Sequence, residues 1–211
     1  MNMDNELIES MVSRHTPGVY EKVSNIKVGI AGAGGIGSNV AVSLSRLGIG
    51  EITVVDFDTV EASNLNRQQY FIEDIGKYKV NALKDIIKRI NPFIRVNAIV
   101  AKIDSENVND YFKDVDIIIE AFDGAENKAM ISNYVLTKMR DKYLVASSGM
   151  AGYSSSNIIT TKKIRDKFYL CGDFVNEVND ESGVMAPRVL ICANHMANMV
   201  LRIIMGQKEI E

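Results

Sequence analysis

The segment Lys27–Asp58 reads KVGIAGAGGIGSNVAVSLSRLGIGEITVVDFD. It begins with an apolar run at Val28–Ala31, passes through a glycine cluster and a row of small and apolar residues, and ends with a second apolar run at Ile52–Val55. This order predicts a strand, a tight turn, a helix and a second strand, which together form one βαβ unit. We therefore expect an α/β fold of the Rossmann-like, doubly wound type, with a mostly parallel sheet and helices on both faces.

The first turn of this unit carries a glycine motif. Its glycines are Gly32, Gly34, Gly35 and Gly37, which include the G-x-G-x-x-G spacing. Glycines allow a sharp turn and the close approach of a phosphate, and the N–H groups at the start of the following helix then face that phosphate. Asp56 ends the second strand, where an acid can accept hydrogen bonds from ribose hydroxyls. The motif predicts a nucleotide ligand without saying which one, and a glycine turn that binds nothing is the alternative.

A polar stretch at Val60–Phe71 follows the second strand and fits neither helix nor strand periodicity. Long loops in compact domains tend to be functional, and this one begins at the carboxyl end of a strand, beside the ligand crevice of such sheets. It offers Arg67, and Lys79 lies at the start of the next helix. Arginine grips phosphate with two N–H groups and lysine neutralises it as a point charge. Two cations beside the glycine turn favour a triphosphate over a dinucleotide.

The stretch Val115–Gly124, with its unbroken run Ile117–Ile119, predicts a buried central strand, and the acidic residue Asp123 falls just past the end of that strand. Parallel strands bring Asp123 to the same edge of the sheet as Gly32 and Asp56. A carboxylate beside a triphosphate is repulsive unless it holds a metal, and Mg²⁺ is the natural bridge. The alternative is an N-cap for the helix expected from Glu126.

The remaining chain predicts further elements within one domain of 211 residues. A helical arm is expected at residues 1–24, the nucleotide-binding core at 25–148, and strands, a loop and a C-terminal helix at 149–211. We expect a short helix at Ser105–Phe112 capped by Ser105, and two short strands joined by a basic turn at Lys162–Arg165. A long apolar helix is expected at Ala186–Met205.

Composition narrows the functional classes. The net charge is −3, from 24 basic and 27 acidic residues, which gives no reason to expect nucleic acid as a ligand. The N-terminus lacks the pattern of a signal peptide, and no run approaches the length needed to cross a bilayer. The two cysteines, Cys171 and Cys192, form no disulfide framework. We therefore expect a cytoplasmic protein without membrane association.

Several motifs together resemble the ThiF/MoeB group, the prokaryotic relatives of ubiquitin-activating enzymes. The matching pieces are GIAGAGGIGSN (Gly29–Asn39), VVDFDTVEASNLNRQ (Val54–Gln68), GKYK ending at Lys79, RINPFI (Arg89–Ile94) and EAFDG around Asp123. The string from Asp56 to Gln68 is far more specific than the glycine motif alone. The stretches GMAGYSSSN (Gly149–Asn157), FYLCGD (Phe168–Asp173) and MAPR (Met185–Arg188) look most like a compact ThiF subgroup.

The resemblance implies an activity. An enzyme of this kind would adenylylate the C-terminal glycine carboxylate of a ThiS-like, ubiquitin-fold sulfur carrier ending in Gly-Gly, using ATP and Mg²⁺ and releasing pyrophosphate, in the sulfur transfer that makes the thiamine thiazole. A homodimer is also implied.

The resemblance also assigns residues. Asp56 and Asp58 belong to the ribose side of the site, Asp123 would hold magnesium, and the glycine turn would cradle phosphate. The phosphates would be held by Asn64, Arg67, Gln68 and Lys79. Arg14 would act across the dimer interface, and Cys171 would accept the activated carrier or sulfur, with a structural thiol the alternative.

The chain departs from the family pattern at two places. It lacks the two CxxC pairs that commonly bind structural zinc, so no zinc site is expected. Where many relatives have Asp-Asn-x-x-x-Arg, this chain has Asp123-Gly124 and then Lys128, which leaves the role of that lysine open. Two other functions stay open: a tRNA threonylcarbamoyladenosine dehydratase of the same superfamily, and an NAD(P)-binding oxidoreductase.

Overall fold

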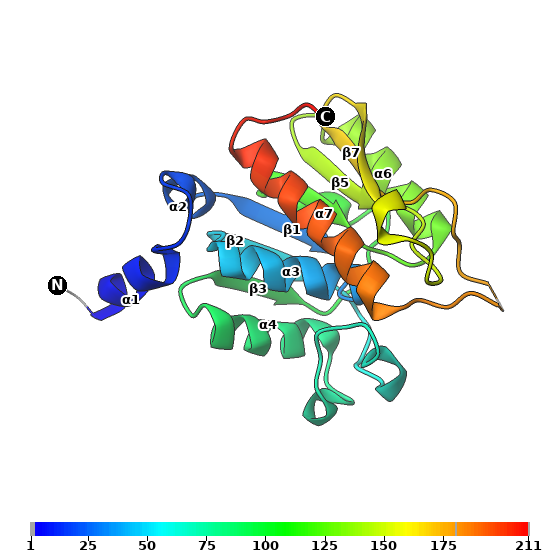
Figure 1. The fold of residues 1–211 in the computed structure, drawn as a ribbon, viewed down its shortest axis with the longest axis horizontal. Coiled ribbons are helices and arrows are strands. Elements are labelled where there is room, and N and C mark those ends of the chain that lie inside the picture. The colour runs from blue at the N-terminus through cyan, green and yellow to red at the C-terminus, as the bar shows by residue number, and fades with distance from the viewer. Residues whose placement is uncertain (1–2, 180, 211) are drawn as a thin grey trace.

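A computed structural model describes residues 3–179 and 181–210. Its described part contains one sheet of seven strands in the order β3-β2-β1-β4-β5-β7-β6 (Figure 1). The strands are β1 (Lys27–Ala31), β2 (Glu51–Val55), β3 (Arg95–Ile99), β4 (Ile117–Glu120), β5 (Tyr143–Ser147), β6 (Thr160–Arg165) and β7 (Phe168–Gly172). All neighbouring strands pair in parallel except β6, which runs antiparallel to β7 at the edge. The predicted Rossmann-like α/β class is confirmed.

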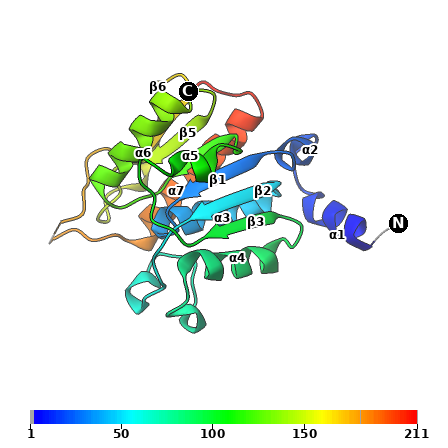
Figure 2. The same cartoon turned by 180° about the vertical axis from the view of Figure 1, so that it is seen from behind.

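The helices cover both faces of the sheet (Figures 1 and 2). The α-helices are α1 (Met3–Val12), α2 (Val19–Val23), α3 (Gly35–Leu47), α4 (Lys79–Ile90), α5 (Val108–Phe112), α6 (Ala125–Lys138) and α7 (Ala186–Ile204). Short 3₁₀ turns lie at Ala62–Asn64, Ile72–Asp74 and Ser156–Ile158. One apolar cluster joins α3, α4 and α7 to one face, and a second joins α5 and α6 to the other.

Strand β1 shows how the sequence divides between the two faces. Val28 and Ile30 belong to the cluster under α3 and α7, whereas Ala31 belongs to the cluster under α5 and α6, as the alternation of side chains in a strand requires. Gly29 also faces α5, and a Cβ there would lie 2.5 Å from the Phe112 ring. The absence of a side chain at Gly29 therefore lets the Phe112 ring lie directly on the sheet.

The order of the strands creates a switch point at β1. The chain moves from β1 to β2 and β3 on one side, then crosses to β4 and β5 on the other. The loops after β1 and β4 therefore diverge at the carboxyl edge, and ligands of open α/β sheets bind in such a crevice. Helices α1 and α2 lie at the opposite, amino edge, where the Gly50 amide donates to the Val23 carbonyl. No helix of the described residues is long and apolar enough to cross a membrane.

Two local predictions were wrong. The helix expected from Ser105 begins at Val108 with Asn107 as its N-cap, because the Asp104 carboxylate accepts the Glu106 and Asn107 amides and holds this segment as a turn. The basic residues Lys162–Arg165 belong to strand β6 rather than to a turn, since cross-strand pairing with β7 extends through them.

A buried ion pair fixes the start of α7. The Arg188 guanidinium pairs with the Asp173 carboxylate just after β7, and Arg188 Nη1 also donates to the carbonyls of Ser154 and Ser155 at 2.6 and 2.9 Å. Burial by itself raises the pKa of Asp173, but hydrogen bonds from Asn176 and the neighbouring backbone, with the Arg188 charge, hold that pKa below its ordinary 3.8. One arginine thus joins α7, β7 and the loop before β6.

We predict that Arg188→Met lowers the free energy of unfolding by about 3–5 kcal/mol, because it leaves the Asp173 carboxylate buried without its counter-charge. A folded-state pKa below 3.8 means that the contribution of Asp173 is complete above this value and is lost as the pH falls through the folded pKa. Denaturant unfolding at neutral pH and again below pH 3.8 should show the difference from wild type shrinking in acid. Arg165→Met, on the exposed edge strand, is the control. An unchanged unfolding midpoint for Arg188→Met would contradict the assignment.

Candidate nucleotide-binding site

The glycine turn after β1 has the backbone that a phosphate cradle requires. Gly32 adopts φ +98°, and its amide donates to the Val55 carbonyl at 2.9 Å. A Cβ at Gly37 would lie 1.9 Å from the Gly32 carbonyl oxygen, so only glycine lets α3 pack this closely. The N-cap of α3 is Gly34, and no side chain caps it. The first amides of α3 are therefore available to an anion, and their binding of phosphate remains a prediction.

Asp56 is held against the glycine turn. Its Oδ2 accepts the Ala33 amide at 2.6 Å and its Oδ1 accepts the Asp58 amide at 2.7 Å. Burial raises the pKa of Asp56, although the two amides and the Lys79 charge oppose this shift. A carboxylate has further lone pairs, so Asp56 can still accept hydrogen bonds from ribose hydroxyls.

Tyr70 is a buried partner of the turn that the sequence patterns did not reveal. Its hydroxyl donates to the Ala33 carbonyl at 2.6 Å. Burial, followed by the nearby Asp56 charge, raises the pKa of Tyr70 well above its ordinary value, so the hydroxyl stays protonated and remains a donor. Its only signal in the sequence was an aromatic residue in a polar loop.

Lys79 and Asp58 form a pair beside Asp56. Lys79 Nζ lies 2.8 Å from Asp58 Oδ2, and the Lys79 amide donates to the Asp58 carbonyl at 2.9 Å. The lysine is only 7% exposed, whereas the Asp58 side chain is 47% exposed. Asp58 thus orients the lysine, and the buried ammonium adds positive charge to the crevice. The predicted contacts of both residues with a ligand remain predictions.

Arg67 lies over the first turn of α3. A Cβ on Gly35 would lie 3.6 Å from Arg67 Cγ, which places the arginine stem beside the cradle. Arg67 Nη1 donates to Asn66 Oδ1 at 2.7 Å and to the Ser63 carbonyl at 3.3 Å. No acidic side chain pairs with it within residues 3–179 and 181–210, so its charge is free to meet an anionic ligand.

The two predicted amide ligands differ. Asn64 Oδ1 accepts the Glu61 amide at 3.1 Å, and the residue is buried, so Asn64 shapes the loop. Gln68 Oε1, in contrast, is buried without a hydrogen-bond partner among the described atoms. Gln68 Nε2 lies near Gly34, 3.9 Å from the position of a Cβ there. A buried acceptor without a donor beside an uncapped helix fits a site that a ligand completes.

Asp123 lies between β4 and α6, across the crevice from Asp56. It is exposed, and it has no hydrogen bond or ion pair within the described part of the chain. Its alternative role as an N-cap is wrong, because Gly124 is the N-cap of α6 and no side chain caps this helix. The Gly32 turn packs against the same loop, since a Cβ on Gly32 would lie 2.8 Å from the Ala121 carbonyl oxygen. A free carboxylate beside the phosphate cradle fits a Mg²⁺ ligand, which remains a prediction.

A charged group that the sequence patterns missed lies behind this loop. Glu120, the last residue of β4, is 1% exposed. Both of its carboxylate oxygens accept a hydrogen bond from Lys128 Nζ at 3.1 Å. Lys128 Nζ also donates to the carbonyl and hydroxyl oxygens of Ser147 at 3.1 and 3.0 Å. The only hint in the sequence was an acid that ends the run Ile117–Ile119.

Two predicted residues lie apart from this cluster. Arg14 is exposed in the turn after α1, on the amino side of the sheet, so within one chain it cannot reach the crevice (Figure 1). Cys171 is fully buried in β7, and burial raises the pKa of its thiol to about 12. A buried, protonated thiol is closed to a macromolecular partner, so the prediction of Cys171 as an acceptor has no support in this arrangement.

Comparisons with known proteins identify the family of this chain. The model of the ThiF family matches residues 9–211. The adenylyltransferase and sulfurtransferase UBA4 of Candida glabrata is 29% identical over 205 residues, which cover 93% of this chain and 47% of that protein. A tRNA threonylcarbamoyladenosine dehydratase of Haemophilus influenzae is 36% identical over 140 residues, covering 65% of this chain and 52% of that protein. The chain spans about half the length of these curated relatives.

Among solved structures, the Escherichia coli tRNA N6-threonylcarbamoyladenosine dehydratase TcdA in complex with ATP has the same fold. It superposes with a TM-score of 0.84 at 21% identity, covering 96% of this chain and 95% of that one. The match of the family model over almost the whole chain, together with the glycine turn and the charged crevice, shows that the chain belongs to the ThiF family.

Proposed function

We propose that this protein binds ATP with Mg²⁺ and adenylylates the C-terminal glycine carboxylate of a ThiS-like, ubiquitin-fold sulfur carrier ending in Gly-Gly, for sulfur transfer to the thiamine thiazole. The observation that carries the proposal is the presence of three features at the carboxyl edge of the sheet: the uncapped start of α3, the cations Arg67 and Asp58-paired Lys79, and the Asp123 carboxylate, which has no partner among the described residues. A dinucleotide requires neither the two cations nor the metal ligand. ATP is also the nucleotide in the solved TcdA complex.

The reaction requires positioning and charge neutralisation rather than a protein nucleophile. A carboxylate oxygen of the carrier forms a bond to the α-phosphorus of ATP, and the bond from that phosphorus to the bridging oxygen breaks with its electron pair, so that pyrophosphate leaves. Arg67 and the Asp58-oriented Lys79 would stabilise the negative charge on the phosphates. Asp123 would hold Mg²⁺, which when bound neutralises phosphate charge. Asp56 would orient the ribose.

The choice of carrier follows from the resemblance to compact ThiF proteins and from the relative named an adenylyltransferase and sulfurtransferase. A homodimer is part of the proposal, with Arg14 supplied from the second copy.

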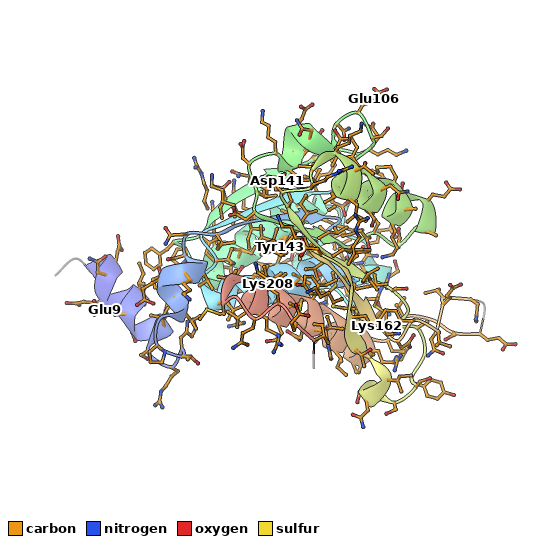
Figure 3. All side chains as sticks on the ribbon, turned by 90° about the horizontal axis from the view of Figure 1, so that it is seen from above. Glu9, Glu106, Asp141, Tyr143, Lys162 and Lys208 are labelled. Atoms are coloured by element: carbon orange, nitrogen blue, oxygen red, sulfur yellow. The ribbon has the colours of Figure 1, made fainter. Side chains whose placement is uncertain are left out.

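A second candidate is a dehydratase that acts on threonylcarbamoyladenosine in tRNA. It is favoured by the 36% identity to the Haemophilus influenzae enzyme and by a fold that matches TcdA over nearly the whole of both chains. Strand β6 and its turn add cations at the sheet edge, with Lys162 Nζ stacked 3.9 Å from the centre of the Phe174 ring. Figure 3 shows Lys162 on the other side of the molecule from Glu9 on α1. An oxidoreductase has less support, because Arg67 and Lys79 exceed what a nicotinamide cofactor needs.

ATP–pyrophosphate exchange by the purified protein separates the first two candidates. We expect exchange with Mg²⁺ and a Gly-Gly-ended carrier and none without the carrier, because adenylylation is reversible only when the carboxylate is present. A carrier truncated by its final glycine is the control. ATP hydrolysis that depends on tRNA, with no carrier-dependent exchange, would overturn the carrier assignment in favour of the dehydratase. Binding of NADH in place of ATP would overturn both.

We predict that Lys79→Ala and Asp123→Ala each lower carrier-dependent exchange by about 100- to 1000-fold, as loss of one contact with developing charge does elsewhere. Both should fold, because Lys79 pairs with a carboxylate that is half exposed and Asp123 has no partner in the described chain. Thermal unfolding of each variant checks this. Lys84→Ala is the matched control, because Lys84 is a half-buried lysine on the same helix, α4. Exchange at the wild-type rate would remove the substituted residue from the mechanism.

Mixing two inactive variants tests Arg14 across the dimer. If Arg14 serves the crevice of the second copy, Arg14→Ala combined with Lys79→Ala forms mixed dimers in which one crevice has both native residues. Exchange should therefore reappear after the two variants are mixed and allowed to re-associate. Activity that stays at the level of the separate variants, with mixed dimers demonstrated by differently tagged copies, would exclude the role in trans.

A further inference from the structure

The buried pair of Glu120 and Lys128 closes the base of the loop that carries Asp123. Glu120 ends β4, and Lys128 lies one turn into α6, where its amide donates to the Gly124 carbonyl at 3.0 Å. The four loop residues 121–124 lie between these two anchors. Glu120 Oε1 also accepts the Phe122 amide at 2.7 Å, so the carboxylate binds both the loop backbone and the lysine.

Lys128 also ties this loop to the next strand. The same ammonium that contacts Glu120 donates to both oxygens of Ser147 at the end of β5. The loop is bound to β1 as well, because the Ala121 amide donates to the Ala31 carbonyl at 2.9 Å. One side chain therefore couples the carboxyl ends of β4 and β5, on the side of the crevice opposite Lys79.

The pair requires an explanation beyond stability. Glu120 is 1% exposed and the Lys128 side chain 26%, and apolar residues of similar volume often stabilise a core as well as a buried ion pair does. Such a pair is better suited to fixing one arrangement of the chain than to adding stability. Asp123 lies in the fixed loop and is itself without a partner in the described residues.

We propose that Lys128 is a positioning residue, which through Glu120 and Ser147 holds the 121–124 loop so that Asp123 presents its carboxylate to the metal of a bound nucleotide. The inference rests on the proposed function, since it assumes that Asp123 meets Mg²⁺ bound with ATP. Lys128 touches neither nucleotide nor metal in this assignment. It acts only through the loop.

Equilibrium binding of ATP in the presence of Mg²⁺ and again in EDTA tests the proposal without turnover. In the wild type, Mg²⁺ should tighten ATP binding, and Asp123→Ala should remove this gain. Lys128→Met should reduce the gain by about 10- to 100-fold, as loss of groups that orient metal ligands does. ATP affinity in EDTA should stay within about twofold of wild type, because the α3 cradle, Arg67 and Lys79 are untouched. Lys128→Arg, which keeps the charge and the donors, should restore most of the gain.

The controls separate positioning from folding. Lys138→Met, on the exposed last turn of α6, should behave as wild type. Lys128→Met leaves the Glu120 carboxylate buried without its counter-charge. The double variant Glu120→Gln, Lys128→Met removes that buried charge, and Mg²⁺ should still fail to tighten ATP binding fully in this variant. A full metal gain in Lys128→Met or in the double variant would overturn the proposal. If Lys128→Met weakened ATP binding in EDTA as much as it does in Mg²⁺, the proposal would also be overturned, since Lys128 would then support binding of the nucleotide itself.

Failure of the proposed function has a different signature. If Mg²⁺ does not tighten ATP binding in the wild type, or still does so in Asp123→Ala, the assignment of Asp123 to the metal is wrong. If Asp123→Ala loses the gain and Lys128→Met keeps it, only the positioning role is wrong.

Discussion

The close approach of α3 to the turn after β1 is the constraint on which the rest of this structure depends. Gly37 lies so near the Gly32 carbonyl that any Cβ would overlap it. This contact directs the first amides of α3 at the carboxyl edge and brings the helix onto the sheet, where α7 packs beside it. A bulkier residue at either glycine would move the helix start, and the phosphate cradle with it.

The charges at this edge are arranged by depth. The deeper members, Lys79 and Glu120, are nearly inaccessible, and each has an oppositely charged partner that is more exposed: Asp58 for the lysine and Lys128 for the glutamate. Arg67 and Asp123, which have no oppositely charged partner among the described residues, are more exposed. Burying an unpaired charge is costly, so the protein pairs what it buries and leaves unpaired only what solvent or a ligand can reach.

The two candidate substrates would share the nucleotide site and would differ in the protein surfaces that contact them. A carrier tail and a modified nucleoside would both present a carboxylate to the α-phosphate, so the same proposed cradle, cations and metal ligand would serve either reaction. The difference must lie in the surfaces around the crevice, in the loops after β5 and β7 and in the basic edge strand β6. Arg188 orders the first two of these loops through Asp173 and the carbonyls before β6.

The sequence by itself determined the fold class and the position of the glycine turn after β1. Apolar periodicity, the glycine spacing and the acid at Asp56 are local patterns whose physical meaning does not depend on distant residues, and they placed the βαβ unit and its glycine turn correctly. The loop with Arg67 and the helix start at Lys79 were expected near the carboxyl edge of the sheet, because the strands of a parallel sheet all end at one edge.

Only the tertiary structure decided which charges are paired and which are free. Glu120, Lys128 and Ser147 come from two strands and a helix, and no spacing along the chain predicts that the Lys128 ammonium contacts both Glu120 and Ser147. The burial of Cys171 depends on α7 packing over β7, and the strand at Lys162–Arg165 depends on pairing with its neighbour, which outweighs the local preference for a turn. Contacts between segments distant in the chain set both outcomes, and such contacts leave no local pattern to find.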